Sequence, residues 1–371
     1  MTHEHWMDRA LNLARLGVGR VNPNPVVGAV IVKGGRLIGQ GYHQAYGHAH
    51  AEPNALASCT EDPRDATMYV TLEPCCHYGK NPPCTEAILA SGITTVVVGS
   101  ADPNPKVSGG GVTALRAGGI TVIEGVLQEA CDRANTVFFH YISKNTAYVV
   151  QKYAMTADGK IATHTGASRW ISGEAARAHV HQTRNALSAI LVGIGTVLAD
   201  DPLLTCRLPT GGRNPLRVIC DSRLMIPLES QIAATAQEIP TVIACHTADA
   251  ERARQLEALG CRILPCPGQS GRVDLRMLME TLHAESIDSV LAEGGAALNY
   301  SLFEAGLVQR LQVYLAPKIF GGESAKGPVG GTGVFLPEDA FFLGQPTITP
   351  LSEDLLLEYD VIGGDGPCLP G

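Results

Sequence analysis

The chain has little of what marks a membrane protein or an exported one. None of its apolar runs approaches the ~20 residues that a helix needs to span a bilayer. The first residues, 1–6, contain no basic segment followed by an apolar one, so no secretory signal is expected. The 11 cysteines are an odd number without framework spacing, which is typical of reduced thiols. We therefore expect a cytoplasmic protein that makes no contact with a membrane.

The chain is also poor in aromatic residues and in positive charge. Aromatic residues make up 5% of the sequence, and the net charge at pH 7 is −8. Proteins that bind nucleic acid usually have a basic surface and aromatic side chains on which bases stack. We therefore expect a small free substrate and no nucleic-acid partner, although a local basic pocket is compatible with this balance. With 371 residues, 45% of them apolar and 17% charged, the chain reads as a globular protein of two or three domains.

The most informative stretch, residues 48–84, contains an imidazole, several thiols and a carboxylate. His50 and Glu52 stand two residues apart, and Cys75 and Cys84 follow, each after a proline. Three N and S ligands hold zinc tetrahedrally and leave the fourth position for water, as in catalytic zinc sites. Bound zinc lowers the pKa of that water from about 16 to about 7. Glu52 can then take a proton from the water and pass it to a leaving amine.

The spacing of the two cysteines leaves the ligand set open. Zinc nucleobase deaminases show H-x-E followed by P-C-x-x-C, whereas eight residues separate Cys75 from Cys84 here. Cys76 and His77 are alternative ligands. We prefer Cys75 and Cys84 because each follows a proline and is expected to open a helix, whose dipole favours a thiolate. A structural zinc site, or cysteines of a reduced core, is the other interpretation.

Residues 1–145 alternate between helical and extended patterns. Gly34 and Gly35 join two apolar runs, 26–33 and 36–42, which is a hairpin signal. Helices are expected at 7–16, 52–58, 85–91, 111–117 and 127–142, and strands at 68–72, 94–99 and 120–124. This alternation predicts an α/β sandwich in which both ligand turns lie at strand-to-helix junctions.

A polar linker at 144–146 precedes a second set of elements. Strands are expected at 148–153, 189–192, 216–220, 241–244, 289–292 and 311–315, and helices at 174–184, 250–259, 274–284 and 297–305. The chain is therefore expected to have two α/β domains, 1–145 and 146–371. The glycine-rich segment 321–333 is expected to be a mobile loop before final strands near 340–342 and 355–362 and a tail at 363–371.

Glu293, Gly294 and Gly295 form the most informative motif of the second half. A strand is expected to end in the acid, the glycines to form the turn, and a helix to begin at once. Glycines let the backbone approach a phosphate, and a helix N-terminus offers free N–H groups to it. Such a turn alone is more often a plain tight turn. It is not G-x-G-x-x-G, so a standard dinucleotide-binding fold is not indicated.

Longer motifs in both halves resemble one family. In order along the chain they are 23–28, 41–43, 50–52, 71–75, 79–84, 102–105, 154–162, 168–172, 195–205, 221–222 and 293–295. Together they resemble the bifunctional riboflavin-biosynthesis deaminase/reductase over residues 5–320, and the long spacing between Cys75 and Cys84 is that family's own variant. The resemblance implies a cytidine-deaminase-like α/β/α sandwich followed by a dihydrofolate-reductase-like α/β domain that uses NADPH.

The resemblance also implies roles for individual residues. Zinc would be bound by His50, Cys75 and Cys84, with Glu52 as the proton shuttle. Asn24 would contact the pyrimidine, and the ribose phosphate would be approached by His43, His77 and Lys80. The NADPH site would be lined by Met155, Trp170, Thr196, Asp200, Ser222, Gly294, Gly295, Ala296 and Ala297. The phosphorylated substrate would be held by Ser168, Arg184, Leu204 and Arg207, the arginines acting as phosphate clamps. Lys152 and Glu293 are both candidates to assist proton delivery.

Ordinary alternatives exist for several of these residues. Trp170 is equally expected in a core, Asp200 as a helix cap and Arg184 as a solvated helix residue. Asn24 and Lys80 have the alternatives of a turn residue between prolines and an exposed loop lysine.

The implied function is two consecutive steps on one phosphorylated pyrimidine. Zinc-dependent hydrolytic deamination of 2,5-diamino-6-(5-phosphoribosylamino)pyrimidin-4-one would precede reduction of the ribosyl side chain to ribityl by NADPH. One alternative keeps the deaminase but makes the second half a non-catalytic dimerisation or RNA-presenting domain. Another is a zinc-stabilised structural protein without turnover, which leaves Glu52 without a role. The family commonly forms dimers or tetramers, so a homo-oligomer is expected.

Overall fold

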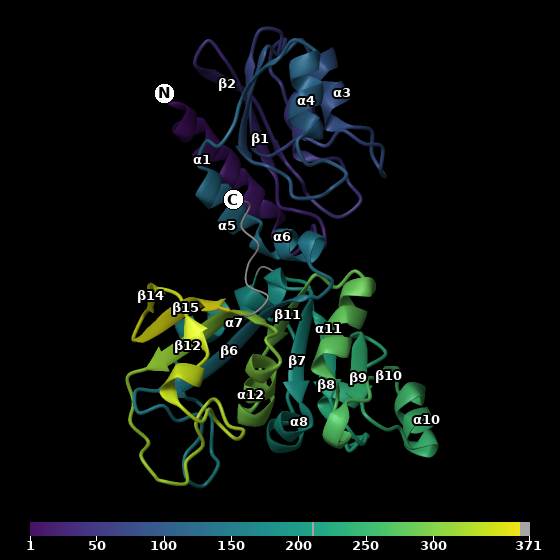
Figure 1. Cartoon of the computed structure of the whole chain (residues 1–371), viewed down its shortest axis with the longest axis vertical. Helices are drawn as coiled ribbons and strands as arrows, with labels where there is room; N and C mark the ends of the chain where they lie inside the picture. Colours follow the sequence, from purple (N-terminus) through teal and green to yellow (C-terminus); the bar gives the residue numbers. More distant parts are fainter. Residues whose placement is uncertain (210, 364–371) are drawn as a thin grey trace. The chain divides into compact units, whose positions relative to one another are not determined.

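The computed structural model describes residues 1–209 and 211–363. The chain divides into two compact units, one of them Met1–Lys144 and the other beginning at Asn145 (Figure 1). Each unit has its own sheet and its own core. In the ranges that the structure describes, no helix combines the length and the apolar character needed to cross a membrane.

The sheet of the first unit has five strands in the order β2-β1-β3-β4-β5. β1 pairs in antiparallel orientation with both β2 and β3, whereas β3, β4 and β5 run parallel to one another. The hairpin between β1 and β2 turns at Gly34 and Gly35, which both have positive φ, as the glycine pair predicts. The strands are β1 (Gly28–Lys33), β2 (Arg36–Tyr42), β3 (Thr67–Leu72), β4 (Thr95–Ser100) and β5 (Thr121–Ile123).

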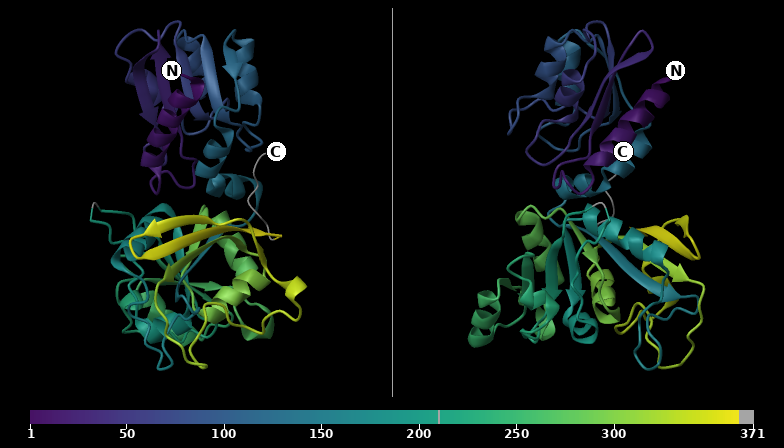
Figure 2. Two further views of the ribbon diagram at one scale, coloured as in Figure 1. Left: turned by 90° about the vertical axis from the view of Figure 1, so that its left-hand side faces the viewer. Right: turned by 180° about the vertical axis from the view of Figure 1, so that it is seen from behind.

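Helices cover both faces of this sheet (Figures 1 and 2). Alternate residues of a strand point to opposite faces. Val30 accordingly packs with Trp6 of α1, while Ile31 packs with Ala55 of α2. One face carries α1 (His3–Ala14) and α5 (Gln128–Ala134), and the other α2 (Ala51–Ala57), α3 (Cys84–Ala90) and α4 (Gly110–Ala117). The predicted α/β/α sandwich is confirmed.

Two helices of this unit differ from the prediction. The first begins at His3 rather than at residue 7, because Oγ1 of Thr2 accepts a hydrogen bond from the His5 N–H and caps the helix. The helix predicted at 127–142 is two helices, α5 and α6 (Thr136–Ser143), interrupted at Asn135. The Asn135 side chain bonds to the backbone of Val26, and such side-chain bonding competes with helical structure.

The second unit contains a ten-stranded sheet in the order β10-β9-β8-β7-β11-β6-β12-β15-β13, with β14 paired to β15. The seven strands from β10 to β12 run parallel, so their carboxyl ends share one edge, and the remaining pairs are antiparallel. The strands are β6 (Tyr148–Thr156), β7 (Ala189–Gly193), β8 (Leu216–Cys220), β9 (Thr241–Cys245), β10 (Cys261–Pro265), β11 (Ser289–Ala292), β12 (Val308–Ala316), β13 (Phe342–Leu343), β14 (Thr347–Leu351) and β15 (Asp354–Ile362).

Helices cover both faces of this sheet as well. In β7, Leu191 packs toward α11 and α12, whereas Ile190 packs into the cluster on the opposite face that contains residues of α8, α9 and α10. On the same side as that cluster, Val180 of α7 packs against Tyr314 of β12. The helices are α7 (Glu174–Ala186), α8 (Ile194–Asp200), α9 (Gln231–Ala234), α10 (Ala250–Ala258), α11 (Leu275–Ala284) and α12 (Ala296–Glu304).

Several elements of the structure were not predicted. The helix α8 contains Gly195, Thr196 and Val197, which all have low helix propensity. The strand β14 contains Pro350, which is compatible with an edge strand, and β14 pairs with β15 alone. Also missed were α9, β10 and the 3-10 turns η1 (Arg15–Gly17), η2 (Gln269–Gly271) and η3 (Pro337–Asp339). The segment 321–333 has no helix or strand. Of the predicted tail at 363–371, residues 364–371 lie outside the described residues.

Two candidate active sites

The three predicted zinc ligands meet in the first unit. His50 directly precedes α2, Cys75 follows β3, and Cys84 is the first residue of α3. Their ligand atoms all lie within 4.8 Å of one another. The Nδ1 atom of His50 is 3.5 Å from Sγ of Cys75 and 3.3 Å from Sγ of Cys84. Usual zinc–nitrogen and zinc–sulfur bond lengths place tetrahedral N and S ligands about 3.6 Å apart. The donor set therefore fits zinc.

Cys75 does not open a helix, contrary to the sequence prediction, but lies in the loop after β3. Its sulfur accepts a hydrogen bond of 3.3 Å from the backbone N–H of Cys84, at the start of α3. A hydrogen bond from the Cys84 thiol, followed by one from His50, outweighs burial and lowers the pKa of Cys75 to about 4. The same contact with Cys75 raises the pKa of the Cys84 thiol. A thiolate at Cys75 is thus favoured by the N-terminus of a helix that is not its own.

Glu52 lies beside these ligands in the first turn of α2 and is 3% exposed. Burial raises its pKa to about 7. The alternative ligands are not part of the cluster, because among the described residues the group that can hold a metal consists of His50, Cys75 and Cys84. The sulfur of Cys76 instead donates to the carbonyl oxygen of Lys106 at 3.8 Å.

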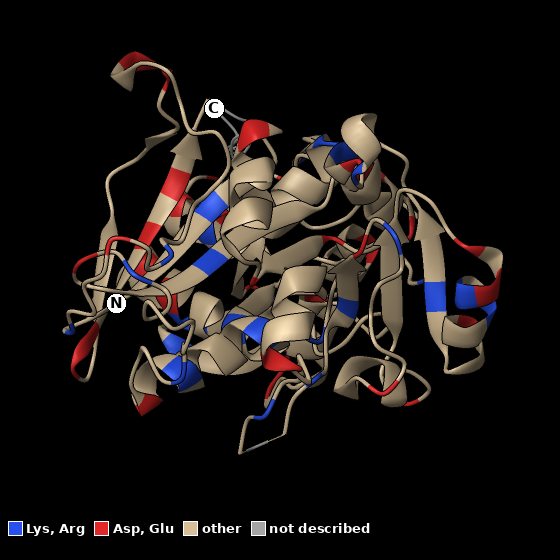
Figure 3. Ribbon diagram, turned by 90° about the horizontal axis from the view of Figure 1, so that it is seen from below, with Lys and Arg blue, Asp and Glu red and all other residues tan. Residues whose placement is uncertain are grey.

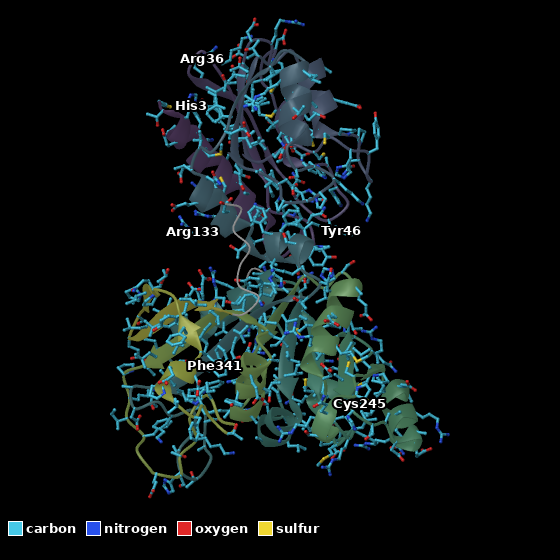
Figure 4. The ribbon with its side chains drawn as sticks, viewed as in Figure 1. His3, Arg36, Tyr46, Arg133, Cys245 and Phe341 are labelled. Carbon is cyan, nitrogen blue, oxygen red and sulfur yellow. The ribbon has the colours of Figure 1, made fainter. Side chains whose placement is uncertain are left out.

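A cavity of about 460 Å³ opens in front of the metal ligands and Glu52. The Nδ1 atom of His43 lies 3.0 Å from the carbonyl oxygen of Ala49, so Nδ1 carries the proton and Nε2 accepts from Nδ2 of Asn24 at 3.2 Å. Burial lowers the pKa of His43, which favours this neutral form. The ammonium of Lys80 lies 4.0 Å from the ring centroid of Tyr46, labelled in Figure 4. The four substrate residues predicted for the first unit all line the cavity: Asn24, His43, His77 and Lys80.

Glu73 is a residue of this site to which the sequence analysis gave no role. Its buried carboxylate accepts hydrogen bonds from the backbone N–H groups of Gly109 and Val112, each at 3.0 Å, and from Asp102 at 3.4 Å. It thereby ties the loop that carries Cys75 to the segment 102–112. The motif Glu-Pro-Cys contained this residue, but nothing in the local sequence links it to a segment some thirty positions away.

The second unit brings together three residues that are distant in the sequence. The Nε and Nη2 atoms of Arg184, on α7, donate to the two carboxylate oxygens of Glu293 at 2.7 and 3.0 Å. The Nζ atom of Lys152, on β6, lies 3.5 Å from Oε2 of Glu293. Burial alone would raise the pKa of Glu293, but the charges of Arg184 and then Lys152 outweigh it and lower the pKa to about 2. Glu293 is therefore a carboxylate at neutral pH, and Arg184 is not a solvated helix residue.

A cavity of about 680 Å³ lies at this cluster, within the size range of small-molecule sites. A Cβ added to Gly195 would meet no atom within 4 Å, so this glycine leaves open space in the cavity. Lys326 and Gly330 also line it, which places the glycine-rich segment at the site. The predicted residues that line it are Lys152, Ser168, Thr196, Asp200, Glu293, Gly294, Gly295, Ala296 and Ala297. Their arrangement fits a bound dinucleotide.

Other predicted residues do not line this cavity. Trp170 is not a core residue, because it is 63% exposed, and its ring lies 4.6 Å from the guanidinium of Arg177. Asp200, which does line the cavity, is the last residue of α8 and not its cap, because the C-cap is Asp201. Ser222 lines a neighbouring cavity. Met155 packs against the core, and Arg184, Leu204 and Arg207 are also absent from the lining. The roles of all these residues stay predictions.

Comparison with protein families and curated relatives agrees with both sites. Residues 1–100 match the cytidine and deoxycytidylate deaminase zinc-binding region, and residues 147–338 match the RibD C-terminal domain. The riboflavin biosynthesis protein RibD of Actinobacillus pleuropneumoniae is 49% identical over 98% of this chain and 96% of its own length. Its counterpart from Bacillus amyloliquefaciens is 40% identical over 95% of each chain.

Solved structures of such proteins have the same fold. Acinetobacter baumannii RibD matches with a TM-score of 0.86 and 34% identity, covering 97% of this chain and 98% of the other. A deaminase/reductase from Thermotoga maritima matches with a TM-score of 0.83 and 38% identity at the same coverage. Fold and sites define a two-domain enzyme that joins a zinc-site deaminase to an α/β reductase. The chain belongs to the RibD family of riboflavin biosynthesis proteins and is a bifunctional deaminase and reductase.

Proposed function

We propose that residues 1–145 deaminate 2,5-diamino-6-(5-phosphoribosylamino)pyrimidin-4-one and that residues 146–371 reduce the ribosyl chain of the product to ribityl with NADPH. The observation that carries this proposal is the meeting of His50, Cys75 and Cys84 beside buried Glu52, in one chain with the cluster around Glu293. The related structure from Thermotoga maritima is named for both activities on these phosphoribosylamino compounds.

In the first step, Glu52 moves the protons. Zinc, when bound by the three ligands, supplies a water whose pKa lies at about 7. The Glu52 carboxylate accepts a proton from that water and returns it to the amine that leaves as ammonia. Its pKa of about 7, raised by burial, suits a group that must both accept and donate a proton at neutral pH.

The pyrimidine and its phosphate are held by the residues that line the same cavity. The hydrogen bond from Nδ2 of Asn24 to His43 fixes the amide, so that Oδ1 of Asn24 is left to accept from an amino or ring N–H group of the base. The imidazole of His77 and the ammonium of Lys80 supply hydrogen-bond donors for the phosphate, and Lys80 also supplies charge.

In the second step, Lys152 holds the proton that accompanies reduction. NADPH supplies the hydride. Glu293 is ionised and cannot be the donor, so it positions the Lys152 ammonium at the cavity. Arg184 balances the charge of Glu293, and Arg207, which is exposed, is therefore the better phosphate clamp of the two arginines.

We further propose that the remaining predicted residues share the two ligands of the second unit. Thr196, Asp200 and the turn Gly294–Ala297 line the cavity and hold NADPH, together with Met155, Trp170 and Ser222 nearby. Ser168 and Leu204 contact the phosphorylated substrate of the reduction. An RNA-presenting role for this half is less favoured, because Lys and Arg are interspersed with Asp and Glu in Figure 3.

We also propose that the chain forms a homo-oligomer, either a dimer or a tetramer. Several large apolar side chains of the segment 335–362 are exposed, and two of them, Phe342 and Ile362, lie opposite each other on β13 and β15. Exposed apolar patches commonly mark interfaces. The exposed side chains include Phe335, Phe342, Ile348 and Ile362. Light scattering on the wild type and on Ile348→Lys tests this, because the charge should lower the measured mass. An unchanged monomeric mass in both would contradict it. A cytoplasmic location stays a prediction.

The function is tested by giving the purified, zinc-loaded protein the diaminopyrimidine phosphate and NADPH while ammonia and NADPH absorbance are followed together. Ammonia release followed by NADPH consumption is expected. Ammonia without NADPH consumption would retain the deaminase and favour a non-catalytic second half. If the metal-loaded protein neither releases ammonia nor consumes NADPH, the proposed substrate is contradicted.

A further inference from the structure

A second cavity, of about 490 Å³, lies in the second unit at the carboxyl ends of β7 and β8. One wall is the segment 220–225 that follows β8, and the other is the segment 270–272 in the connection after β10. Ligands of parallel α/β sheets bind beyond the carboxyl ends of the strands. Ser222 is the one residue of this lining for which the sequence predicted a role.

The charge of this cavity comes from two arginines. Arg223 and Arg272 line opposite walls, and both side chains are exposed. Within residues 1–209 and 211–363, neither guanidinium takes part in an ion pair or a hydrogen bond. Asp221 is the acid of the lining, but its carboxylate faces its own loop, where it accepts from the backbone N–H of Ile226 at 2.7 Å. The cavity therefore offers two uncommitted positive charges.

The backbone on both walls is held in place. The Nε atom of Arg252 donates to the carbonyl oxygen of Leu224 at 3.2 Å, and its Nη2 donates to that of Ile226. The carbonyl oxygen of Ser222 accepts from the N–H of His246 at 3.1 Å. On the other wall, the N–H of Gly268 donates to the carbonyl oxygen of Arg272 at 2.9 Å. The two arginines thus extend from fixed positions.

This cavity adjoins the one assigned to NADPH. Ile194 lines it, while its neighbours Gly193 and Gly195 line the larger cavity at Lys152, so the two share the turn between β7 and α8. In the strand order β8-β7-β11-β6, β8 lies three inter-strand distances from β6, the strand of Lys152. These distances add up to about 14 Å. A dinucleotide in an extended conformation covers that length.

We propose that Arg223 and Arg272 bind the 2′-phosphate of NADPH and thereby select NADPH over NADH. The inference rests on the proposed use of NADPH by the second unit. The two cofactors differ by this phosphate on the adenosine ribose, and the planar guanidinium group binds phosphate oxygens in pairs. An acid that accepts from the ribose hydroxyls favours NADH. Asp221 is turned away from that role by its own loop.

Binding to the full-length protein tests the proposal without turnover. Calorimetric titrations with NADPH, NADH, 2′,5′-ADP and 5′-AMP are made on the wild type and on Arg223→Ala/Arg272→Ala. We expect the double variant to lose about 10- to 100-fold in affinity for NADPH and 2′,5′-ADP, while NADH and 5′-AMP affinities stay within about threefold. Arg254→Ala is the matched control, because Arg254 is exposed on α10, pairs with Glu251 and does not line the cavity.

The outcomes separate this inference from the function on which it rests. An unchanged preference for NADPH in the double variant would overturn the inference and leave NADPH use intact. Equal losses for NADPH and NADH would also overturn it, because the arginines would then bind a part common to both cofactors. A wild-type protein that neither binds nor consumes NADPH would contradict the proposed reductase function instead. Retained affinity of the double variant for NADH and 5′-AMP reports that the second unit is folded.

Discussion

The ammonium of Lys152 lies 3.5 Å from the carboxylate of Glu293, although Lys152 lies within β6 and Glu293 directly follows β11, some 140 residues later. No local spacing in the sequence brings them together or ranks them as proton donors. The bidentate contact of Arg184 with Glu293 provides the ranking, because it keeps Glu293 ionised. Lys152 is then the member of the pair that we propose as the proton donor.

Lys152→Met should abolish most of the reductase activity and leave the deaminase unchanged. Removing a positioned proton donor typically costs about 10²- to 10⁴-fold in rate. NADPH oxidation is measured with the deaminated intermediate as substrate, and ammonia release from the diamino substrate is the internal control. Equal losses in both reactions would indicate misfolding, which circular dichroism would detect. Full reductase activity would contradict the assignment of Lys152.

Glu293 should make the stability of the second unit depend on pH in the acid range. Its pKa falls from an ordinary value of 4.5 to about 2 in the folded chain. The ionised form is therefore stabilised by folding above pH 4.5, and this contribution is lost as the pH falls toward 2. A shift of this size corresponds to about 3 kcal/mol in the free energy of unfolding.

The measurement compares urea unfolding of the wild type and Glu293→Gln at pH 7 and pH 3.5. The chain has two tryptophans, so a Trp6→Phe background leaves Trp170 to report on the second unit. The wild type should be more stable at pH 7, and the difference should shrink at pH 3.5. A difference that grows on acidification would contradict the low pKa of Glu293.

Much of the first site could be predicted because its residues lie within one short stretch. His50, Cys75 and Cys84 are brought together by two strand-to-helix connections, and local patterns predict such connections well. The source of the thiolate at Cys75 was predicted wrongly, because the helix that favours it begins nine residues later, at Cys84. Glu73 was missed for a similar reason, since its hydrogen-bond partners lie beyond the next strand.

The second site was less predictable because its residues come from elements that are distant in the sequence: Lys152 from β6, Arg184 from α7 and Glu293 from the turn after β11. Lys152, Arg184 and Glu293 meet only once β6 and β11 are paired and α7 covers the sheet. The cavity with Arg223 and Arg272 likewise depends on the connections after β8 and β10, and β10 itself was not predicted. Pairing between strands that are far apart in the chain is set by tertiary packing, on which local patterns carry little information.

Asn135 should affect deamination although it lies outside the cavity. Its Oδ1 accepts a hydrogen bond from the N–H of Val26 at 2.9 Å, and its Nδ2 donates one to the carbonyl oxygen of Val26 at 3.0 Å. Val26 is two residues from Asn24, so this contact positions the loop that holds the pyrimidine. Asn135→Ala should raise KM for the diamino substrate and destabilise the first unit by about 1–3 kcal/mol. Unchanged deamination kinetics would show that the loop keeps its position without Asn135.

The zinc ligands and Glu52 should be separable by experiment. Glu52→Gln conserves the shape of the side chain but cannot take up a proton, so it should retain zinc and lose about 10²- to 10⁴-fold in deamination rate. Cys84→Ser should lose zinc and activity together, because three protein ligands are needed to hold the metal. Metal content is measured by mass spectrometry beside ammonia release, with NADPH oxidation as the control for the second unit.

Full deaminase activity in Glu52→Gln would show that another group shuttles the proton. Zinc retained at full occupancy in Cys84→Ser would return Cys76 and His77 to consideration as ligands.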